Sequence, residues 1–216
     1  MNGVEIETDG EGVVVRFDRL LPVVSSAVVG GGFALARAVV NVHVPKSFRW
    51  DAAERVLGDF VRRRAIAFPY IGLLTAAWTQ NAEVVTATAD GLTATAVVTV
   101  GLSNAIGAGR TPAVAWTPST INAIVVVEAA PEPVALVNLI ITATEAKTLV
   151  LAEAGVRAAD GRLASGTSTD AVVVAATGHG PRCRFGGPVS ELGAVVARAV
   201  REALGAGVDR WLEEHR

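Results

Sequence analysis

The chain has 216 residues, of which 51% are hydrophobic and 19% are charged. This composition excludes a globally disordered chain, because so apolar a sequence can bury enough surface to offset the entropy lost on folding. The length suits a single domain over residues 1–216. The formal net charge of -2, with no basic cluster among aromatic residues, argues against a nucleic-acid partner.

No segment predicts export or a membrane span. Residues 1–10 lack the basic and then apolar layout of a signal peptide, and the single cysteine, Cys183, cannot form an internal disulfide. Apolar runs such as 121–127 and 134–143 are shorter than the roughly 20 residues that a membrane-spanning helix needs. We therefore expect a cytoplasmic protein with no membrane partner.

The first third of the chain predicts a hairpin, a glycine turn, a strand and a helix. Residues 4–17 alternate apolar and polar side chains around Asp9-Gly10, which predicts an edge hairpin with a two-residue turn. Three glycines at 30–32 mark a sharp turn or a close approach to a ligand, and 38–44 predicts a strand. Apolar residues at helical spacing predict a helix over 51–64.

The middle of the chain predicts the strands of the main sheet. Val and Thr alternate over 83–89 and 92–100, on both sides of Asp90-Gly91, which indicates a β-hairpin. The β-branched run at 120–128 is too apolar for a half-exposed strand, so we expect it at the centre of a sheet covered on both faces. A shorter run at 172–176 has the same character.

Two longer helices are predicted, over 132–152 and 189–211. The first is apolar nearly all the way round, which is typical of a buried helix, and the second is amphipathic. Helices and strands do not alternate strictly, so the expected fold class is α+β, with a largely antiparallel mixed sheet layered with two or three longer helices.

Two ionisable residues interrupt the apolar helix, Glu145 and Lys147. Burying either without a partner costs several kcal/mol, so each should face a counter-charge, a hydrogen-bonding network or an aqueous cleft. Positions two apart on a helix differ by about 200°, so the two side chains cannot face the same pocket. A structural ion pair with another segment is the alternative to a functional role.

Polar clusters stand at 101–105, 119–122 and 166–170, at the ends of predicted strands. Their small hydroxyl and amide side chains suit the binding of amides or the positioning of a water, and Asp170 suits a general base. Turn and capping chemistry is the alternative reading of such residues. The three histidines and Cys183 are too far apart in sequence for a zinc site, so we expect no protein-held metal.

Taken in order, the clusters resemble the adenosylcobinamide amidohydrolase family. The resemblance runs from about residue 20 to about residue 205, and the segments that carry it are 25–32, 101–105, 120–122, 144–147 and 164–171. Three serines depart from the family pattern: Ser119 stands where the pattern has Gly before Thr-Ile-Asn, Ser165 where it has Ala or Thr, and Ser168 where it has Gly. The resemblance implies hydrolysis of the amide that joins the aminopropanol arm to the corrin ring of adenosylcobinamide, giving adenosylcobyric acid in corrinoid salvage.

An amide is a poor electrophile, so this reaction needs an activated water or hydroxyl, donors for the oxyanion and an acid for the leaving amine. We predict four catalytic residues: Asp170 or Glu145 for activation, Lys147 for charge stabilisation or proton delivery, and Asn104 for the oxyanion. The predicted substrate-binding residues are Gly30, Gly31, Ser103, Ser119, Asn122, Thr167 and Thr169. No protein-bound cofactor is expected, because cobalt arrives inside the corrinoid substrate.

Two alternatives stay open at this point. The departures allow a corrinoid-binding module without activity, and the polar pocket also allows hydrolysis of a complete cobamide or another amide. Trp50, Trp78 and Trp116 are candidates for stacking on the corrin ring or the adenosyl group, against the more common role of a core aromatic residue. The sequence does not determine the oligomeric state.

Overall fold

The computed structural model describes residues 1–113 and 119–216. Its main sheet has eight strands in the order β4-β3-β2-β11-β8-β6-β5, with β1 paired to β2. The strands of the main sheet are β1 (Val4–Thr8), β2 (Gly12–Ser25), β3 (Gly32–His43), β4 (Tyr70–Thr75), β5 (Glu83–Ala89), β6 (Leu92–Val100), β8 (Ile121–Glu128) and β11 (Ala171–Ala176). The helices are α1 (Ala53–Arg63), α2 (Pro133–Glu153) and α3 (Glu191–Glu214).

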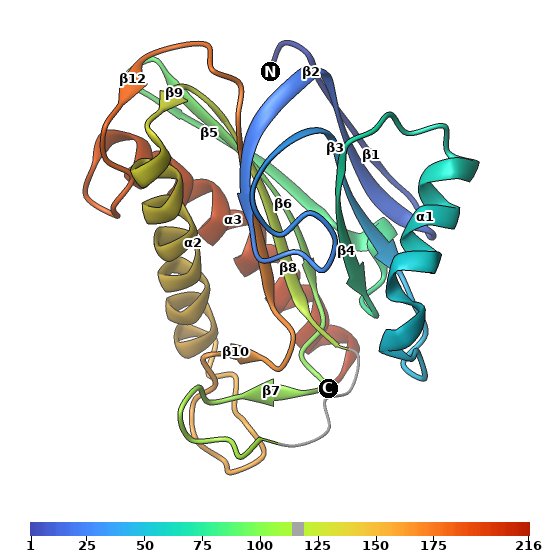
Figure 1. Cartoon of the computed structure of the whole chain (residues 1–216). Coiled ribbons are helices and arrows are strands. Elements are labelled where there is room, and N and C mark those ends of the chain that lie inside the picture. The colour runs from blue at the N-terminus through green and yellow to red at the C-terminus, as the bar shows by residue number, and fades with distance from the viewer. Residues whose placement is uncertain (114–118) are drawn as a thin grey trace.

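The sheet bends so that its two halves pack against each other. Side chains from β2, β3 and β4 meet side chains from β6, β8 and β11 in one buried apolar cluster, which includes Val15, Val39 and Ile124. A second cluster packs α2 and α3 on the outer face of β6, β8 and β11, and a third packs α1 on β2 and β3. Figure 1 shows these layers, with α2 and α3 on one side and α1 on the other.

The architecture confirms the predicted α+β class. Most strand pairs are antiparallel, and the parallel pairs of the main sheet are β11 with β8 and β3 with β4. As expected, β8 lies between β6 and β11 and is buried on both faces. Strand β4 was not predicted from the sequence, because a short apolar strand lacks the apolar and polar alternation that indicates a strand.

The two predicted hairpins differ in their turns. Asp90 and Gly91 have φ values of 51° and 77°, as a two-residue turn of this type requires. The β1–β2 hairpin forms, but its predicted turn is wrong: Asp9 and Gly10 do not adopt positive φ, and the loop is longer. There the Asp9 side chain accepts hydrogen bonds from the backbone N–H groups of Glu11, at 2.8 Å, and Gly12, at 3.1 Å. The side-chain acceptor thus replaces the two-residue turn.

Within the described residues, α2 is the one helix whose length and composition would allow it to cross a membrane, and half of its apolar window is buried in the protein. Leu136, Leu139 and Leu151 are buried in the cluster that α2 and α3 form with the sheet. Packing in the core therefore accounts for part of the apolar character of α2.

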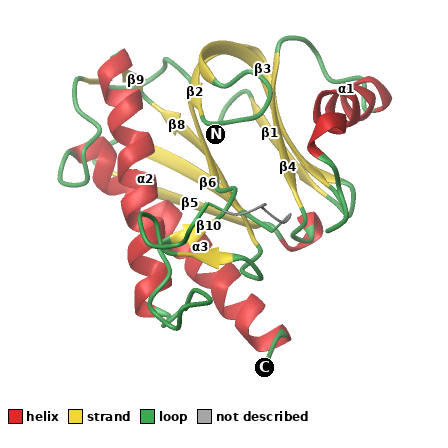
Figure 2. Cartoon of the chain, turned by 60° about the horizontal axis from the view of Figure 1, so that its bottom comes forward, coloured by secondary structure: helices red, strands yellow, loops and turns green. Residues whose placement is uncertain are grey.

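Several strands begin or end at one end of the molecule. At this end, β3, β4 and β6 finish and β8 and β11 begin, since Asn41 pairs with Leu73 and Thr99 pairs with Asn122. At the same end, β7 (Ala105–Ile106) pairs with β10 (Gly166–Thr167). At the opposite end, β9 (Ala130–Pro131) pairs with β12 (Arg182–Cys183). Figure 2 turns the end that carries β10 and the C-terminus toward the reader.

Candidate active site

The candidate site is a cavity of about 410 Å³ where β8 and β11 begin, which we call the central cavity. Asn122 of β8 and the segment 168–171 before and at the start of β11 form one wall, and the loop between β2 and β3 adds Ser26 and Val28. The remaining lining residues are Trp50, Leu73 and Leu74. Amide, hydroxyl and carboxylate groups thus face apolar side chains across one hollow.

Asp170 and Lys147 form an ion pair beside this cavity. Lys147 comes from α2, and the residue is only 8% exposed. Besides the lysine, Asp170 accepts hydrogen bonds from the Thr167 hydroxyl, from the Thr167 N–H at 3.0 Å and from the Ile121 N–H at 3.1 Å. The carboxylate therefore joins three segments, α2, β8 and the approach to β11, at one point.

Gly166 is required by the closeness of this ion pair. A Cβ atom at position 166 would lie 2.6 Å from Lys147 Nζ and would also collide with an oxygen of Asp170. The loop that carries Thr167 can approach the pair because this side chain is missing.

A buried chain of polar side chains continues from the cavity into the space between the two halves of the sheet. Asn122 Nδ2 donates to Asn41 Oδ1 at 2.8 Å and to the Leu74 carbonyl oxygen at 2.9 Å. Asn41 Nδ2 in turn donates to the Thr99 hydroxyl at 3.0 Å. On the cavity side, the Thr120 hydroxyl lies 3.3 Å from Asn122 Oδ1 and donates to the Thr169 carbonyl oxygen at 2.7 Å. These bonds fix the amide of Asn122 in one orientation.

A second and larger cavity, of about 670 Å³, adjoins the central cavity and shares Ser168 with it. Asn104 and Ser103 line this outer cavity, and Asn104 Nδ2 donates to the Ser168 hydroxyl at 2.7 Å. The Ser103 N–H donates to the Ser119 hydroxyl at 3.2 Å, and the Thr169 hydroxyl donates to the Ser119 carbonyl oxygen at 3.1 Å. The predicted residues of three separate clusters therefore meet here.

Eight of the predicted site residues lie in or beside these cavities: Asn104, Asn122, Lys147, Asp170, Ser103, Ser119, Thr167 and Thr169. Ser168, which was not predicted as a site residue, lines both the central and the outer cavity. Glu145 is the exception among the proposed catalytic residues. It is exposed on α2 and lines none of the described cavities, since it is two positions away from buried Lys147. The prediction that the two side chains face different surroundings is confirmed.

Gly30 and Gly31 also lie outside the cavities that the structure describes. They form the turn between β2 and β3, where Gly30 has a φ of 73° and packs against Ile71 of β4. A Cβ atom at Gly31 would lie 2.5 Å from the Ala27 carbonyl oxygen. These glycines therefore shape the turn that carries Ser26 and Val28 to the central cavity.

The sequence reading did not single out Asn41, Thr120 or Gly166 as site residues. Asn41 had a visible signal, because it is a polar residue inside an apolar strand and such a residue needs a partner when buried. Gly166 had none, since only the fold shows what surrounds it. Of the three tryptophans, Trp50 lines the central cavity, and Trp116 lies outside the described residues.

The arrangement supplies what amide hydrolysis needs, namely amide and hydroxyl groups around a cavity with a carboxylate and an ammonium group at its wall. In the part of the chain that the structure describes, no three His, Cys, Asp or Glu side chains are grouped as a metal site.

Solved structures show the same fold. The β-aminopeptidase of a Burkholderia species superposes with a TM-score of 0.52 at 14% sequence identity, over 96% of this chain and 84% of that one. The PH0078 protein of Pyrococcus horikoshii gives a TM-score of 0.52 at 11% identity, over 99% of this chain and 85% of that one. At such identities the similarity defines the fold alone.

The family follows from the sequence comparisons. The family model described as adenosylcobinamide amidohydrolase matches residues 1–216. A protein of Methanosarcina mazei named adenosylcobinamide amidohydrolase is 33% identical over 190 residues, which cover 84% of this chain and 87% of that protein. The chain belongs to the adenosylcobinamide amidohydrolase family, as its polar clusters predicted.

Proposed function

We propose that this protein hydrolyses the amide that links the aminopropanol arm to the corrin ring of adenosylcobinamide, giving adenosylcobyric acid for corrinoid salvage. Family membership over the whole chain supports the reaction class. The observation that carries the proposal to this site is the convergence of Asn122, Thr169 and Asp170 on one cavity, with Lys147 directly behind Asp170.

The reaction adds one water to the amide carbonyl carbon, breaks the C–N bond and leaves a carboxylate and a free amine. The oxygen of the water becomes part of the new carboxylate, and the leaving nitrogen takes up a proton. Donors must face the carbonyl oxygen as it gains negative charge. In our proposal the Ser168 hydroxyl is such a donor, because it lines the central cavity and can donate its own proton while it accepts a hydrogen bond from Asn104 Nδ2.

We assign activation of the water to Asp170, because it is the acidic side chain that lines the central cavity. Lys147 compensates the charge of that carboxylate and is the candidate proton donor for the leaving amine. Because Asp170 already accepts four hydrogen bonds, one of them must lengthen when the water binds, and the Thr167 hydroxyl can turn away by rotation about a single bond.

The reaction as proposed needs no protein-bound cofactor, because the cobalt arrives inside the corrinoid substrate. The central and outer cavities adjoin at Ser168 and together suit a broad, flat substrate with amides at its rim, because hydroxyl and amide groups line both.

The direct test incubates the purified protein with adenosylcobinamide in water labelled with ¹⁸O and follows the products by mass spectrometry. We expect adenosylcobyric acid carrying one ¹⁸O atom in its new carboxyl group, and free aminopropanol. Binding without turnover would instead support a corrinoid-binding module, and faster turnover of a complete cobamide would reassign the substrate.

Asp170→Asn separates the chemical role from anchoring. Asn keeps an oxygen that can accept from Ile121, but it cannot take a proton from water, so we expect kcat to fall by about 10² to 10⁴ with the fold retained. Glu145→Gln is the matched control, because it neutralises a carboxylate on the exposed face of α2, and its kcat should stay within about twofold of the unmodified protein. Near-normal turnover by Asp170→Asn would show the assignment to be wrong.

A further inference from the structure

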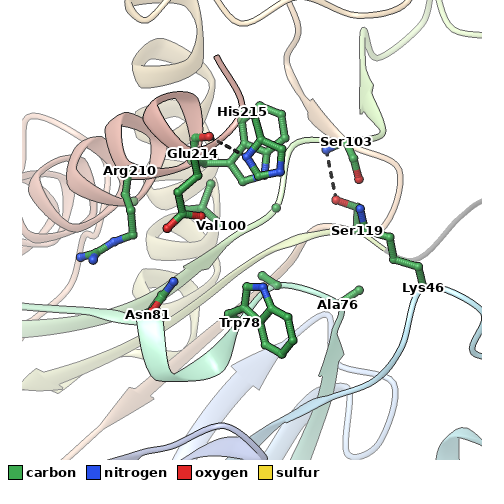
Figure 3. Close-up of a pocket in the computed structure, with 14 residues that line it drawn as sticks. Lys46, Ala76, Trp78, Asn81, Val100, Ser103, Ser119, Arg210, Glu214 and His215 are labelled. Carbon is green, nitrogen blue, oxygen red and sulfur yellow. Dashed lines mark hydrogen bonds between the residues drawn. The ribbon is translucent and has the colours of Figure 1, made fainter.

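A third hollow adjoins the candidate site on the side of α3, and its walls carry aromatic rings. We call it the aromatic recess. It is lined by Trp78 from the segment after β4, by Trp211, Glu214 and His215 near the end of α3, and by Ser103 and Ser119. Figure 3 shows Trp78 and His215 on opposite sides of this recess, with Ser103 and Ser119 at the side where it adjoins the candidate site.

Both aromatic walls are held in place before anything binds. The ring of Trp78 stacks on His43 at a centroid distance of 4.8 Å, and His43 Nδ1 lies 2.9 Å from the Ala77 carbonyl oxygen. On the other wall Trp211 stacks on His215 at 4.1 Å, and His215 Nδ1 lies 2.8 Å from the Trp211 carbonyl oxygen. Trp78 nevertheless stays 58% exposed. Rigid rings at a surface bind a flat partner with little loss of conformational freedom.

The polar groups of the recess fit a heterocycle better than a hydrocarbon. Glu214 offers a carboxylate that accepts hydrogen bonds, and Asn81 offers an amide that both donates and accepts. Within residues 1–113 and 119–216, neither side chain has a hydrogen-bond or ion-pair partner, whereas Arg210 beside them is paired with Glu83. An adenine edge presents an amino donor next to a ring-nitrogen acceptor, which complements this pair.

The position of the recess identifies the molecule that would bring such a group. It shares Ser103 with the outer cavity, and it shares Ser119 with a small pocket that also contains Trp50 and Thr169 of the central cavity. A ligand bound in the recess therefore lies next to the substrate. The substrate of the family carries an adenosyl group on its cobalt.

We propose that the aromatic recess binds the adenine of the substrate's adenosyl group, stacked on Trp78 and bound at its edge by Asn81 and Glu214. This inference rests on the proposed function, and it makes Trp78 a residue that determines specificity for adenosylated corrinoids. It gives the exposed end of α3 a role in binding the substrate.

The test compares two substrates that differ only at the recess: adenosylcobinamide, and cobinamide carrying cyanide in place of the adenosyl group. In Trp78→Ala we expect the ratio of kcat/KM for the adenosyl substrate over the cyano substrate to fall by about tenfold or more, because stacking of one base on an aromatic side chain has an effect of this size. Glu214→Gln should lower the same ratio by about threefold, since it weakens one hydrogen bond.

Phe185→Ala is the matched control, since Phe185 is an exposed aromatic residue of the loop before α3 and lines none of the described cavities. Its substrate ratio should equal that of the unmodified protein. An equal loss on both substrates in Trp78→Ala, or no loss on either, would overturn the proposal.

A binding experiment keeps this inference separate from the proposed function. Titration with 5′-deoxyadenosine should quench the tryptophan fluorescence of the unmodified protein and of Phe185→Ala, and the change should be lost in Trp78→Ala. If neither cobinamide is hydrolysed but the nucleoside still quenches, the proposed function fails and the adenine site stands. If both are hydrolysed and the nucleoside has no effect, the adenine site is refuted.

Discussion

Two groups of ion pairs in this molecule use similar side chains and differ in their surroundings. In the buried pair, Lys147 and Asp170 have side chains only 10% and 12% exposed. In the surface cluster, Arg64 bonds Asp9 and Glu11 between the β1–β2 turn and the end of α1, with Arg64 28% and Asp9 42% exposed. Water screens the second group and is largely excluded from the first, so the same charges should differ several-fold in their effect on stability.

The carboxylate of the buried pair also accepts hydrogen bonds from more segments of the chain than the carboxylate of the surface cluster does. Asp170 accepts two hydrogen bonds from Thr167, three residues before it, and two from distant segments, the Ile121 N–H of β8 and the Lys147 ammonium of α2. Asp9 accepts mainly from its own turn and from Arg64. The buried pair therefore organises the site, whereas the surface cluster ties a hairpin to a helix end.

Replacing the cation of each group tests most directly whether the buried pair contributes more to stability than the surface cluster. We expect Lys147→Met to lower the free energy of unfolding by about 3 to 5 kcal/mol, because it leaves a buried carboxylate without its counter-charge. Urea denaturation of Lys147→Met and of Arg64→Met, measured side by side, checks it. Equal losses in the two variants would show that burial does not separate the two groups.

Gly166→Ala tests how tightly the buried pair is enclosed. The new methyl group would lie 2.6 Å from Lys147 Nζ, so the loop or the pair must move, at a cost of about 1 to 3 kcal/mol. Thermal and urea unfolding measure this cost. Gly187→Ala is a suitable control, because an added Cβ atom meets nothing there within 4 Å. Unchanged stability in Gly166→Ala would mean that the loop yields freely.

Asn41→Leu asks whether the polar chain behind the cavity supports the site. It removes the acceptor of Asn122 and the donor to Thr99, both buried, and should lower the free energy of unfolding by about 1 to 3 kcal/mol. Because Asn122 also loses its fixed orientation, kcat/KM should fall as well. Thr88→Val, at an exposed strand position, controls for the loss of a side-chain hydrogen bond and should change neither quantity measurably. A stable and fully active Asn41→Leu would show that these buried hydrogen bonds do not support the site.

The smallest expected effect concerns pH and the surface cluster. Burial alone would raise the pKa of Asp9, but the hydrogen bonds from Arg64 and from the N–H groups of Glu11 and Gly12 outweigh it, so the pKa lies below its ordinary value. The stabilisation is therefore present above the unfolded-state pKa of about 3.9 and is lost as the pH falls through the folded-state pKa. Arg64→Met should cost at most about 1 kcal/mol at pH 7, and less at pH 3, in urea denaturation. A larger cost at the lower pH would contradict the assigned direction.

The resemblance in the sequence identified the family before the fold was known, because a series of short polar clusters in order is a property of the chain itself. Their meeting is a property of the fold. Asn104 and Ser168 are 64 residues apart and bond at 2.7 Å, while Glu145, two residues from Lys147, is exposed. Helical spacing could exclude a shared pocket for Glu145 and Lys147 but could not say which of them faced inward.

The sequence by itself determined the elements whose signals are local: the hairpin around Asp90-Gly91, the central strand β8, and the two long helices. Their periodicity and turn residues act between neighbours in the chain, so no partner need be known. Only the tertiary structure decided the strand order, the edge strand β4, the space that Gly166 leaves for the ion pair, and the rings of the aromatic recess. These depend on contacts between segments far apart in sequence, which the pattern of any one segment does not contain.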